Sequence, residues 1–256
     1  MGNLVDLTID EQVAVLRLQR PPANAIDLGL AEELQAAIRE ADGRSEVGAL
    51  VLTGGPTIFA AGADIKAMAT WGPEEVRPSV DALGEACDLL EAIDTISIAA
   101  INGYALGGGF ELALGCDLRY AATDATLGQP EIGLGVIPGA GGTQRLVRLV
   151  GPGRTREIVY SGRLIPAEEA LRLGIVERVL EPGVVLDAAV EDARRFANGP
   201  RVALAAAKTA IGAAISSPGA PGIQAEREAF LALFGTPDQR EGMAAFLEKR
   251  EPRFGG

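Results

Sequence analysis

Length, composition and charge narrow the classes of protein to which this chain can belong. Its 256 residues are 48% apolar and include 33 glycines and 15 prolines, a mixture typical of a globular α/β protein. The 23 basic residues stand against 35 acidic ones, and the net charge of −12 argues against a protein that binds nucleic acid. The absence of histidine excludes Ser-His-Asp and Cys-His catalysis and argues against a catalytic zinc. Acid–base chemistry would therefore fall to carboxylates, lysine or tyrosine.

Cysteine usage and hydropathy indicate a cytoplasmic chain. Cys87 and Cys116 occur in a sequence long enough to fold without disulfides, so we expect two free, buried thiols. The longest apolar stretches, such as 96–101, fall far short of the roughly 18 residues that a membrane-spanning helix needs. The opening residues lack a basic segment followed by an apolar one, so we expect no secretory signal. These features predict a cytoplasmic protein that has no membrane partner.

Strand and helix patterns alternate through the first half of the chain. Alternating apolar residues predict a hairpin of strands 5–9 and 13–18, and Asp27 is a candidate cap for a helix that ends near Gly43. Further strands are predicted at 48–53, 96–101 and 117–121, with a helix after the glycines 107–109. This alternation predicts an α/β core.

The last part of the chain has a helical pattern. Thr236 is a candidate N-cap, followed by Pro237 at the first helical position and Gln239 three residues after the cap, and Pro252 is expected to stop this helix. We therefore predict a core with the functional site over residues 1–195 and a helical oligomerisation region over 196–256.

Two glycine-rich segments, 59–66 and 102–113, are candidates for a functional role. Neither has the Gly-Lys-Ser/Thr of a P-loop, and the consecutive glycines 107–109 lack the spacing of a dinucleotide fingerprint. Glu111 lies three residues after Gly108, in the first turn of a predicted helix, where backbone N–H groups are unpaired. The Gly108 N–H could face a developing oxyanion while Glu111 acts as a base, although a tight turn and a capping glutamate would give the same pattern.

A second carboxylate, Glu131, follows twenty residues later among Gly, Pro, Ile and Leu. An apolar setting would raise its pKa and suit it to donate a proton, whereas an exposed loop glutamate is the alternative.

Together these segments closely resemble the enoyl-CoA hydratase/isomerase (crotonase) superfamily, and most of all its bacterial-type hydratases, from about Val13 to Phe254. The matching signatures, in the family's order, are 59–68, 102–117, 128–146, 161–163 with 167–170, and 241–250. The resemblance implies a crotonase-like spiral of ββα units with a C-terminal helical trimerisation region. It also implies a homotrimer or a dimer of trimers.

The resemblance assigns roles to single residues. The backbone N–H groups of Ala63 and Gly108 match the family's oxyanion hole, which holds the thioester oxygen. Glu111 and Glu131 match its two catalytic glutamates, and Gly139 matches a backbone position beside the reacting carbon and water.

Contacts with CoA are also implied by the resemblance. The matching positions are Ala25, Ala61, Asp64, Ile65, Lys66, Phe246 and Lys249, of which the last two reach the CoA of a neighbouring subunit. Relatives often carry a basic residue where this chain has Thr57, and some have a lysine in the segment that is here 21–25. These departures leave Lys66, Lys249 and Arg250 as candidates for the CoA phosphates. Trp71 and the rest of 69–80 are candidates to limit acyl length, as is Phe110, for which core packing is an equal alternative.

The implied activity is reversible syn addition of water to a 2-trans-enoyl-CoA, giving a 3-hydroxyacyl-CoA, in fatty-acid β-oxidation or related acyl-CoA catabolism. Glu111 would take a proton from water and Glu131 would deliver one to Cα. No metal or redox cofactor is expected, because CoA serves only as the carrier of the acyl-CoA thioester substrate. The alternatives are a Δ3-Δ2-enoyl-CoA isomerase, another crotonase-type reaction on acyl-CoA, and a non-catalytic acyl-CoA-binding protein. The presence of both glutamates favours the hydratase.

Overall fold

A six-stranded sheet lies at the centre of the structure, a computed structural model that describes residues 3–255. The first two residues, part of the segment in which we expect no secretory signal, lie outside the described residues. The strand order is β1-β2-β3-β4-β6-β9; β1 and β2 form an antiparallel hairpin, and the other neighbours are parallel. The strands are β1 (Val5–Asp10), β2 (Val13–Leu18), β3 (Ala49–Thr53), β4 (Ile96–Ile101), β6 (Leu118–Ala122) and β9 (Arg178–Leu180). The hairpin and the strands predicted near 48–53, 96–101 and 117–121 are therefore confirmed.

A smaller sheet of three strands determines where the functional residues lie. It consists of β5 (Tyr104–Leu106), β7 (Thr126–Gly128) and β8 (Leu164–Pro166), in that order. β5 and β7 are parallel, and Leu106 is paired with Gly128. Because parallel strands end at the same edge, the segments that follow β5 and β7 leave the sheet side by side.

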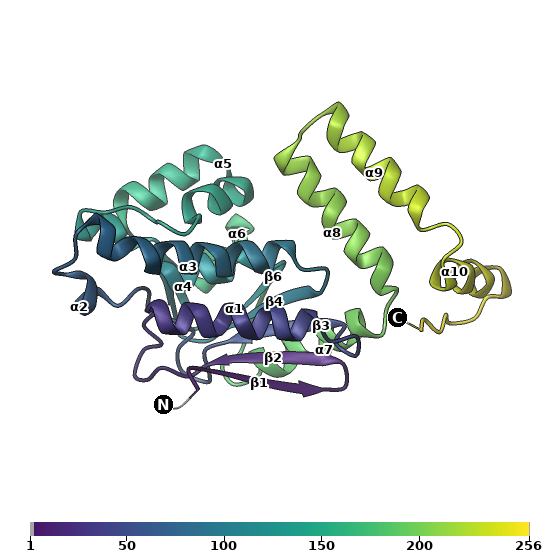
Figure 1. Cartoon of the computed structure of the whole chain (residues 1–256), viewed down its shortest axis with the longest axis horizontal. Helices are drawn as coiled ribbons and strands as arrows, with labels where there is room; N and C mark the ends of the chain where they lie inside the picture. Colours follow the sequence, from purple (N-terminus) through teal and green to yellow (C-terminus); the bar gives the residue numbers. More distant parts are fainter. Residues whose placement is uncertain (1–2, 256) are drawn as a thin grey trace.

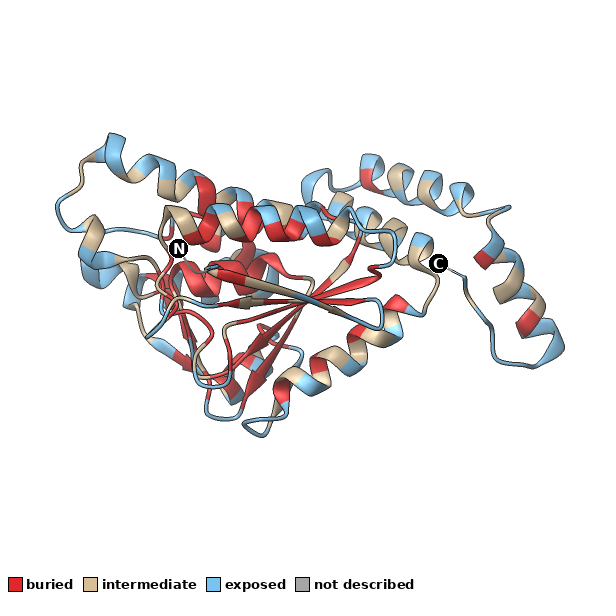
Figure 2. Cartoon of the chain, turned by 60° about the horizontal axis from the view of Figure 1, so that its bottom comes forward, coloured by how far each residue is buried: buried red, intermediate tan, exposed pale blue. Residues whose placement is uncertain are grey.

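Helices cover the large sheet. α1 (Leu28–Asp42) packs against β1, β2 and α3 (Pro73–Ala92), while α7 (Val185–Ala197) packs against β2, β3 and β4. The predicted caps of α1 are confirmed, because the Leu30 N–H donates to the Asp27 carboxylate (2.9 Å) and Gly43 ends the helix. Figure 2 shows that buried residues concentrate in the strands and in the helix faces that cover them. The remaining helical elements of the core are the long helix α5 (Gly142–Ser161) and the shorter α2 (Ile65–Met68), α4 (Gly108–Gly115), η1 (Pro130–Leu134) and α6 (Ala167–Leu173).

The C-terminal helices α8 (Arg201–Ser216), α9 (Ala220–Ala232) and α10 (Pro237–Glu248) project from the body of the molecule (Figure 1). Thr236 caps α10 as predicted, since its hydroxyl accepts from the Gln239 N–H (3.2 Å). The predicted stop at Pro252 is wrong, because α10 already ends at Glu248, where Lys249 adopts a left-handed conformation and closes the last turn. The division of the chain at 195/196 stays a prediction.

Two further expectations concern the cysteines and the membrane. Cys87 and Cys116 are both free and buried, as predicted. Among the described residues, no helix combines the length and the apolar character needed to cross a bilayer.

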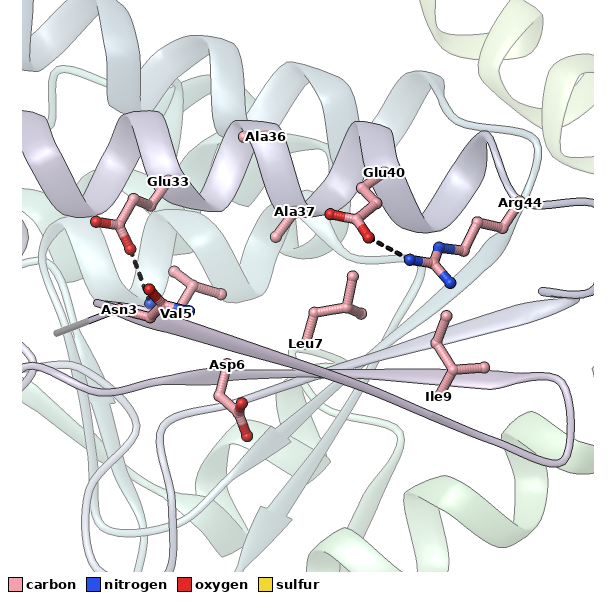
Figure 3. A pocket seen from close by; sticks show the side chains of 10 residues that line it. All are labelled: Asn3, Val5, Asp6, Leu7, Ile9, Glu33, Ala36, Ala37, Glu40 and Arg44. Atoms are coloured by element: carbon pink, nitrogen blue, oxygen red, sulfur yellow. Dashed lines mark hydrogen bonds and ion pairs between the residues drawn. The ribbon is translucent and has the colours of Figure 1, made fainter.

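An open hollow of about 500 Å³ lies between β1 and α1 (Figure 3). Glu33 on α1 accepts hydrogen bonds there from the N–H groups of Leu4 (2.6 Å) and Val5 (3.3 Å), which tie the start of the chain to the helix. None of the predicted functional residues lines this hollow.

Candidate active site

The two glutamates come from the segments that leave β5 and β7. Gly107 follows β5, and its N–H donates to the carbonyl of Gly128, the last residue of β7 (2.9 Å). Glu111 then lies in the first turn of α4, while Glu131 lies in the first turn of η1. A Cβ atom added to Gly107 would lie 3.1 Å from a carboxylate oxygen of Glu131. Gly107 therefore provides the close approach that brings Glu131 to the start of α4.

The two predicted oxyanion donors also meet at this point. The Ile26 N–H donates to the carbonyl of Gly62 (2.8 Å), and the Asp64 N–H donates back to the carbonyl of Ile26 (3.0 Å). The N–H of Ala63, between these two bonded groups, is therefore directed away from Ile26. A Cβ added to Gly108 would lie 3.8 Å from the Ala63 nitrogen, and Gly108 is the first residue of α4, whose N–H has no partner within the helix. The structure thus brings Ala63 and Gly108 together.

Glu111 is almost fully buried, with 3% of its surface exposed. One carboxylate oxygen, Oε1, accepts hydrogen bonds from the N–H groups of Ala140 and Gly142, both at 2.8 Å. Burial raises the pKa of Glu111, whereas the two N–H groups and the positive charge of Arg145 oppose that rise. The second oxygen, Oε2, makes none of these contacts with the 140–142 segment.

Glu131 lies in a different environment. It is half-buried, and burial raises its pKa to about 7, with a smaller contribution from the negative charge of Glu111. With its amide oriented to satisfy its hydrogen bonds, the fully buried Gln129 donates to both carboxylate oxygens, at 2.8 and 3.1 Å. A carboxyl group with a pKa near 7 can be either protonated or ionised at neutral pH, so Glu131 is suited to transfer a proton.

Gly139 lies between Glu111 and the helix α3. It directly precedes Ala140, which binds Glu111, and a Cβ at position 139 would lie 3.3 Å from Val80 Cγ1 on α3. Gly139 is exposed, so its backbone is accessible from the same side as Val80. This is the place in which the resemblance predicts the reacting carbon and water.

A small apolar cavity adjoins Ala63, one of the two predicted oxyanion donors. It has a volume of about 40 Å³, and its lining includes Ala63, Met68, Trp71, Val80 and Leu83. Trp71, a predicted candidate to limit acyl length, thus lines the cavity. The other candidate, Phe110, is fully buried and is not among the lining residues, so its alternative role in core packing is the one that the structure supports.

The positions predicted to contact CoA fall into two groups. Ala25, Ala61, Asp64, Ile65 and Lys66 lie around the start of α2, where Ile65 and Lys66 are exposed. Phe246, which is 83% exposed, and Lys249 lie on α10 and at its end, at the opposite end of the molecule from α2 (Figure 1). One chain alone does not bring these two groups together.

The arginines near the predicted CoA contacts already form ion pairs with carboxylates. Arg250 forms a two-bond ion pair with Glu241 (2.6 and 2.9 Å) and a further bond with Glu248 (2.7 Å), so its guanidinium is already engaged. Arg20, which was not predicted from the sequence, donates to Asp64 and to the carbonyl of Ala25, both at 2.7 Å. Its guanidinium holds the pKa of Asp64 below its usual value.

Two residues of the site were missed in the sequence. Gln129 orients Glu131, and Arg145 contacts the loop that binds Glu111. Both are polar residues that are at least 95% buried. Their positions in the sequence are a weak indication of a role at the site, since Gln129 lies two residues before Glu131 and Arg145 lies three residues after Gly142. Neither position shows that the side chain is buried.

Comparisons with known proteins agree with this fold. The family model described as enoyl-CoA hydratase/isomerase matches residues 8–256. The short-chain-enoyl-CoA hydratase of Clostridium acetobutylicum is 41% identical, over 97% of this chain and 96% of its own. The crotonyl-CoA hydratase of Syntrophomonas wolfei is 42% identical, over 96% of this chain and 95% of its own. The crystal structure of an enoyl-CoA hydratase from Bacillus anthracis matches with a TM-score of 0.93 and 40% identity, covering 98% of each chain.

The chain belongs to the enoyl-CoA hydratase/isomerase family and has its crotonase fold. The resemblance and the α/β fold class predicted from the sequence are thereby confirmed. The trimeric or hexameric state stays a prediction.

Proposed function

We propose that the protein catalyses the reversible syn addition of water to a short-chain 2-trans-enoyl-CoA, giving a 3-hydroxyacyl-CoA. The observation that carries the proposal is the presence of two carboxylates in unlike environments beside two converging N–H groups. Glu111 is bound by backbone N–H groups, whereas Glu131 has a pKa of about 7. Opposed acid and base roles require such a difference. The relatives named as short-chain-enoyl-CoA and crotonyl-CoA hydratases support the same activity.

In the proposed mechanism, the N–H groups of Ala63 and Gly108 bind the thioester oxygen. Glu111 removes a proton from water while the water oxygen forms a bond with Cβ, and the electrons of the double bond move towards the thioester oxygen. The two N–H donors stabilise the negative charge on that oxygen. Glu131 then delivers a proton to Cα, which completes the addition of water. The proposal requires no metal or redox cofactor, since CoA acts only as the carrier.

The small cavity supports a short acyl chain. A water-sized group needs about 10–15 Å³ of such volume, so a cavity of about 40 Å³ accommodates roughly three small groups. The crotonyl chain places one methyl group beyond Cβ, and the hexenoyl chain places three carbons there. Trp71 and Met68 line the cavity and would have to move for a longer chain.

Crotonyl-CoA tests the proposed activity directly. We expect the wild type to abolish the absorbance of the conjugated enoyl thioester and to yield 3-hydroxybutyryl-CoA, identified by mass spectrometry. A protein that binds crotonyl-CoA and hexenoyl-CoA but converts neither would contradict the proposal.

Acyl-chain selectivity tests the role of Trp71. We expect the wild type to have a kcat/KM at least about tenfold higher for crotonyl-CoA than for decenoyl-CoA, since each misplaced methylene costs about 1–3 kcal/mol. Trp71→Ala should reduce this ratio, while Trp71→Phe, which keeps an aromatic ring in place, should largely preserve it. Equal selectivity in all three proteins would show that Trp71 does not limit chain length.

An enoyl-CoA isomerase is the second candidate, because the family includes isomerases. Isomerisation moves a proton within the substrate and needs essentially one carboxylate, so the presence of Glu111 and Glu131 favours hydration. A 3-enoyl-CoA substrate separates the two activities: conversion to the 2-enoyl-CoA without hydration of crotonyl-CoA would identify an isomerase.

A further inference from the structure

Arg145 is a buried arginine that contacts the loop to which Glu111 is bound. It is the fourth residue of α5, and 5% of its side chain is exposed. Its Nη1 donates to the carbonyl of Ala140 (2.7 Å), and its Nη2 donates to Asp88 (2.5 Å) and Glu91 (3.0 Å) of α3. The side chain therefore connects α3 to the loop that binds Glu111.

The same loop binds Glu111 and Arg145 through opposite groups. Ala140 donates its N–H to Glu111 and accepts from Arg145 at its carbonyl, while Gly142 donates its N–H to the same carboxylate oxygen. Between them, Gly141 has a φ of 98°, and a Cβ added to it would lie 2.1 Å from Nη1 of Arg145. The guanidinium thus lies directly against the backbone of residue 141, where a side chain would displace it.

A purely structural role explains the contacts of Arg145 poorly. A buried guanidinium is costly to desolvate, and an ion pair of this kind often contributes little net stability. Within residues 3–255, Nε of Arg145 has no hydrogen-bond partner, so burial of the side chain is incompletely compensated. By contrast Arg119, which is 3% exposed, uses Nε, Nη1 and Nη2 in hydrogen bonds to carbonyl groups and to Glu177.

We propose that Arg145 is a positioning residue for Glu111. Its guanidinium holds the Ala140 carbonyl, so that the N–H groups of Ala140 and Gly142 stay directed at the Glu111 carboxylate, and its charge favours the ionised form of that carboxylate. The inference rests on the proposed function only in that Glu111 is taken to be the base.

The charges around Glu111 fix the direction of the expected effect. The titratable and charged groups that face it are Glu131 of η1, Cys87 of α3 and Arg145 of α5. Burial raises the pKa of the Cys87 thiol, so this group is neutral near pH 7, and Glu131 is acidic. Arg145 is the cation of this set, and it faces Asp88 and Glu91 on its other side. Removal of Arg145 therefore raises the pKa of Glu111 further.

The test compares Arg145→Gln and Arg145→Lys with the matched control Arg119→Gln. Infrared spectra recorded across a pH titration report the pKa of Glu111 directly, since its carboxyl band is identified by its absence in Glu111→Gln. An opposite charge within about 4–6 Å changes a carboxyl pKa by about 1–3 units, and from Arg145, which reaches Glu111 through Ala140, we expect an effect of about one unit. We expect Arg145→Gln to raise the pKa of Glu111 by about that amount, Arg145→Lys to keep it close to the wild-type value, and Arg119→Gln to leave it unchanged.

The pH dependence of kcat/KM for crotonyl-CoA gives a second readout. We expect the acidic limb of the Arg145→Gln profile to move to higher pH, with about a tenfold loss on that limb for one unit, while Arg119→Gln lowers the melting temperature without moving the limb. If Arg145→Gln does not fold, Arg145→Lys should still bind crotonyl-CoA with a wild-type KM and show a reduced kcat. The reason is that the single ammonium group of lysine cannot hold Ala140 and α3 together as the guanidinium does. The proposal would be overturned if the wild type and the folded Arg145 variants had the same Glu111 pKa and the same kcat. An inactive wild type in which Arg145→Gln still raises the Glu111 pKa would overturn the proposed function but not the role of Arg145.

Discussion

The region around the candidate active site and the C-terminal helices differ in how far their apolar side chains are buried. Around Glu111, apolar side chains are buried and both neighbouring N–H groups are bound. In α8–α10 large apolar side chains are exposed, and α8 has no buried residue. The exposed residues include Ile211, Ile215, Phe230, Leu231, Phe234, Phe246 and Leu247.

This contrast shows which part of the molecule one chain can complete alone. In the core, the apolar side chains of the large sheet and of the helices that cover it are buried within one chain, so its geometry can be described from that chain. The C-terminal helices leave an apolar surface that a soluble monomer rarely retains. The predicted assembly of several copies would cover that surface and would bring Phe246 and Lys249 to a neighbouring chain.

Gly108→Ala should produce the largest effect within the core. The added Cβ would lie 2.8 Å from Cδ2 of Leu83, whose side-chain end can shift, but it would also stand beside the Ala63 nitrogen. We expect the variant to fold and to lose about 10²–10³-fold in kcat on crotonyl-CoA, because the added methyl group would obstruct the approach of the thioester oxygen to the Ala63 N–H, and the loss of one oxyanion donor has a cost of this size.

Gly109→Ala, at the next position, should affect folding instead of catalysis. Its Cβ would lie 2.2 Å from the carbonyl oxygen of Ala60, a backbone atom that cannot move aside, so we expect loss of the folded protein. Full activity of Gly108→Ala would show that position 108 does not bind the thioester oxygen.

Phe230→Asp tests the C-terminal helices. Phe230 is 59% exposed on α9 and contacts Phe234 edge to face, with ring centroids 5.2 Å apart. If these side chains lie between subunits, a charge there would be buried without a partner, and assembly should fail at micromolar concentration. Light scattering should then report the 26.4 kDa of one chain instead of a multiple of it.

Arg227→Ala, on an exposed position of the same helix, should leave the mass of the assembly unchanged. A wild type that already has the mass of one chain would refute the predicted trimer or hexamer.

The smallest predicted effect is on stability: Glu131→Gln should change how the stability of the protein depends on pH. Because burial raises the pKa of Glu131 from 4.5 to about 7, the folded state binds a proton more tightly than the unfolded state between these values. The stability of the wild type should therefore fall as the pH rises from 4.5 to about 7. Glutamine removes this penalty, so the variant should be more stable than the wild type at pH 8 by up to about 3 kcal/mol, and the difference should vanish near pH 4.5.

Urea denaturation at pH 4.5 and at pH 8 measures this difference. Glu168→Gln, on an exposed position of α6, serves as the control and should show no such gain. If Glu131→Gln were less stable than the wild type at both pH values, favourable contacts would have to stabilise the ionised form of Glu131.

Local features of the fold were predictable from the sequence, but the contacts around the glutamates were not. Asp27 and Thr236 were recognised as caps because a cap depends on a few consecutive residues. Proximity of Glu111 and Glu131 depends on the parallel pairing of β5 with β7, which no local pattern specifies, and only the family resemblance placed the two together.

Residues that act through tertiary contacts escaped prediction. Arg145 acts through Ala140 and α3, and Gln129 through Glu131, so neither role is visible until the chain is folded. For the same reason the predicted helix stop at Pro252 was wrong, because nothing in the sequence indicates that Lys249 adopts a left-handed conformation.

The proposed role of Glu111 and Glu131 is to add water together to an enoyl thioester. Its most direct test follows crotonyl-CoA consumption by the wild type, Glu111→Gln and Glu131→Gln under identical conditions, with substrate binding measured in parallel. We expect rapid hydration by the wild type and losses of about 10²–10⁴-fold in kcat for each variant, with binding retained. Wild-type activity that persists within tenfold in either variant would contradict the assignment of that glutamate.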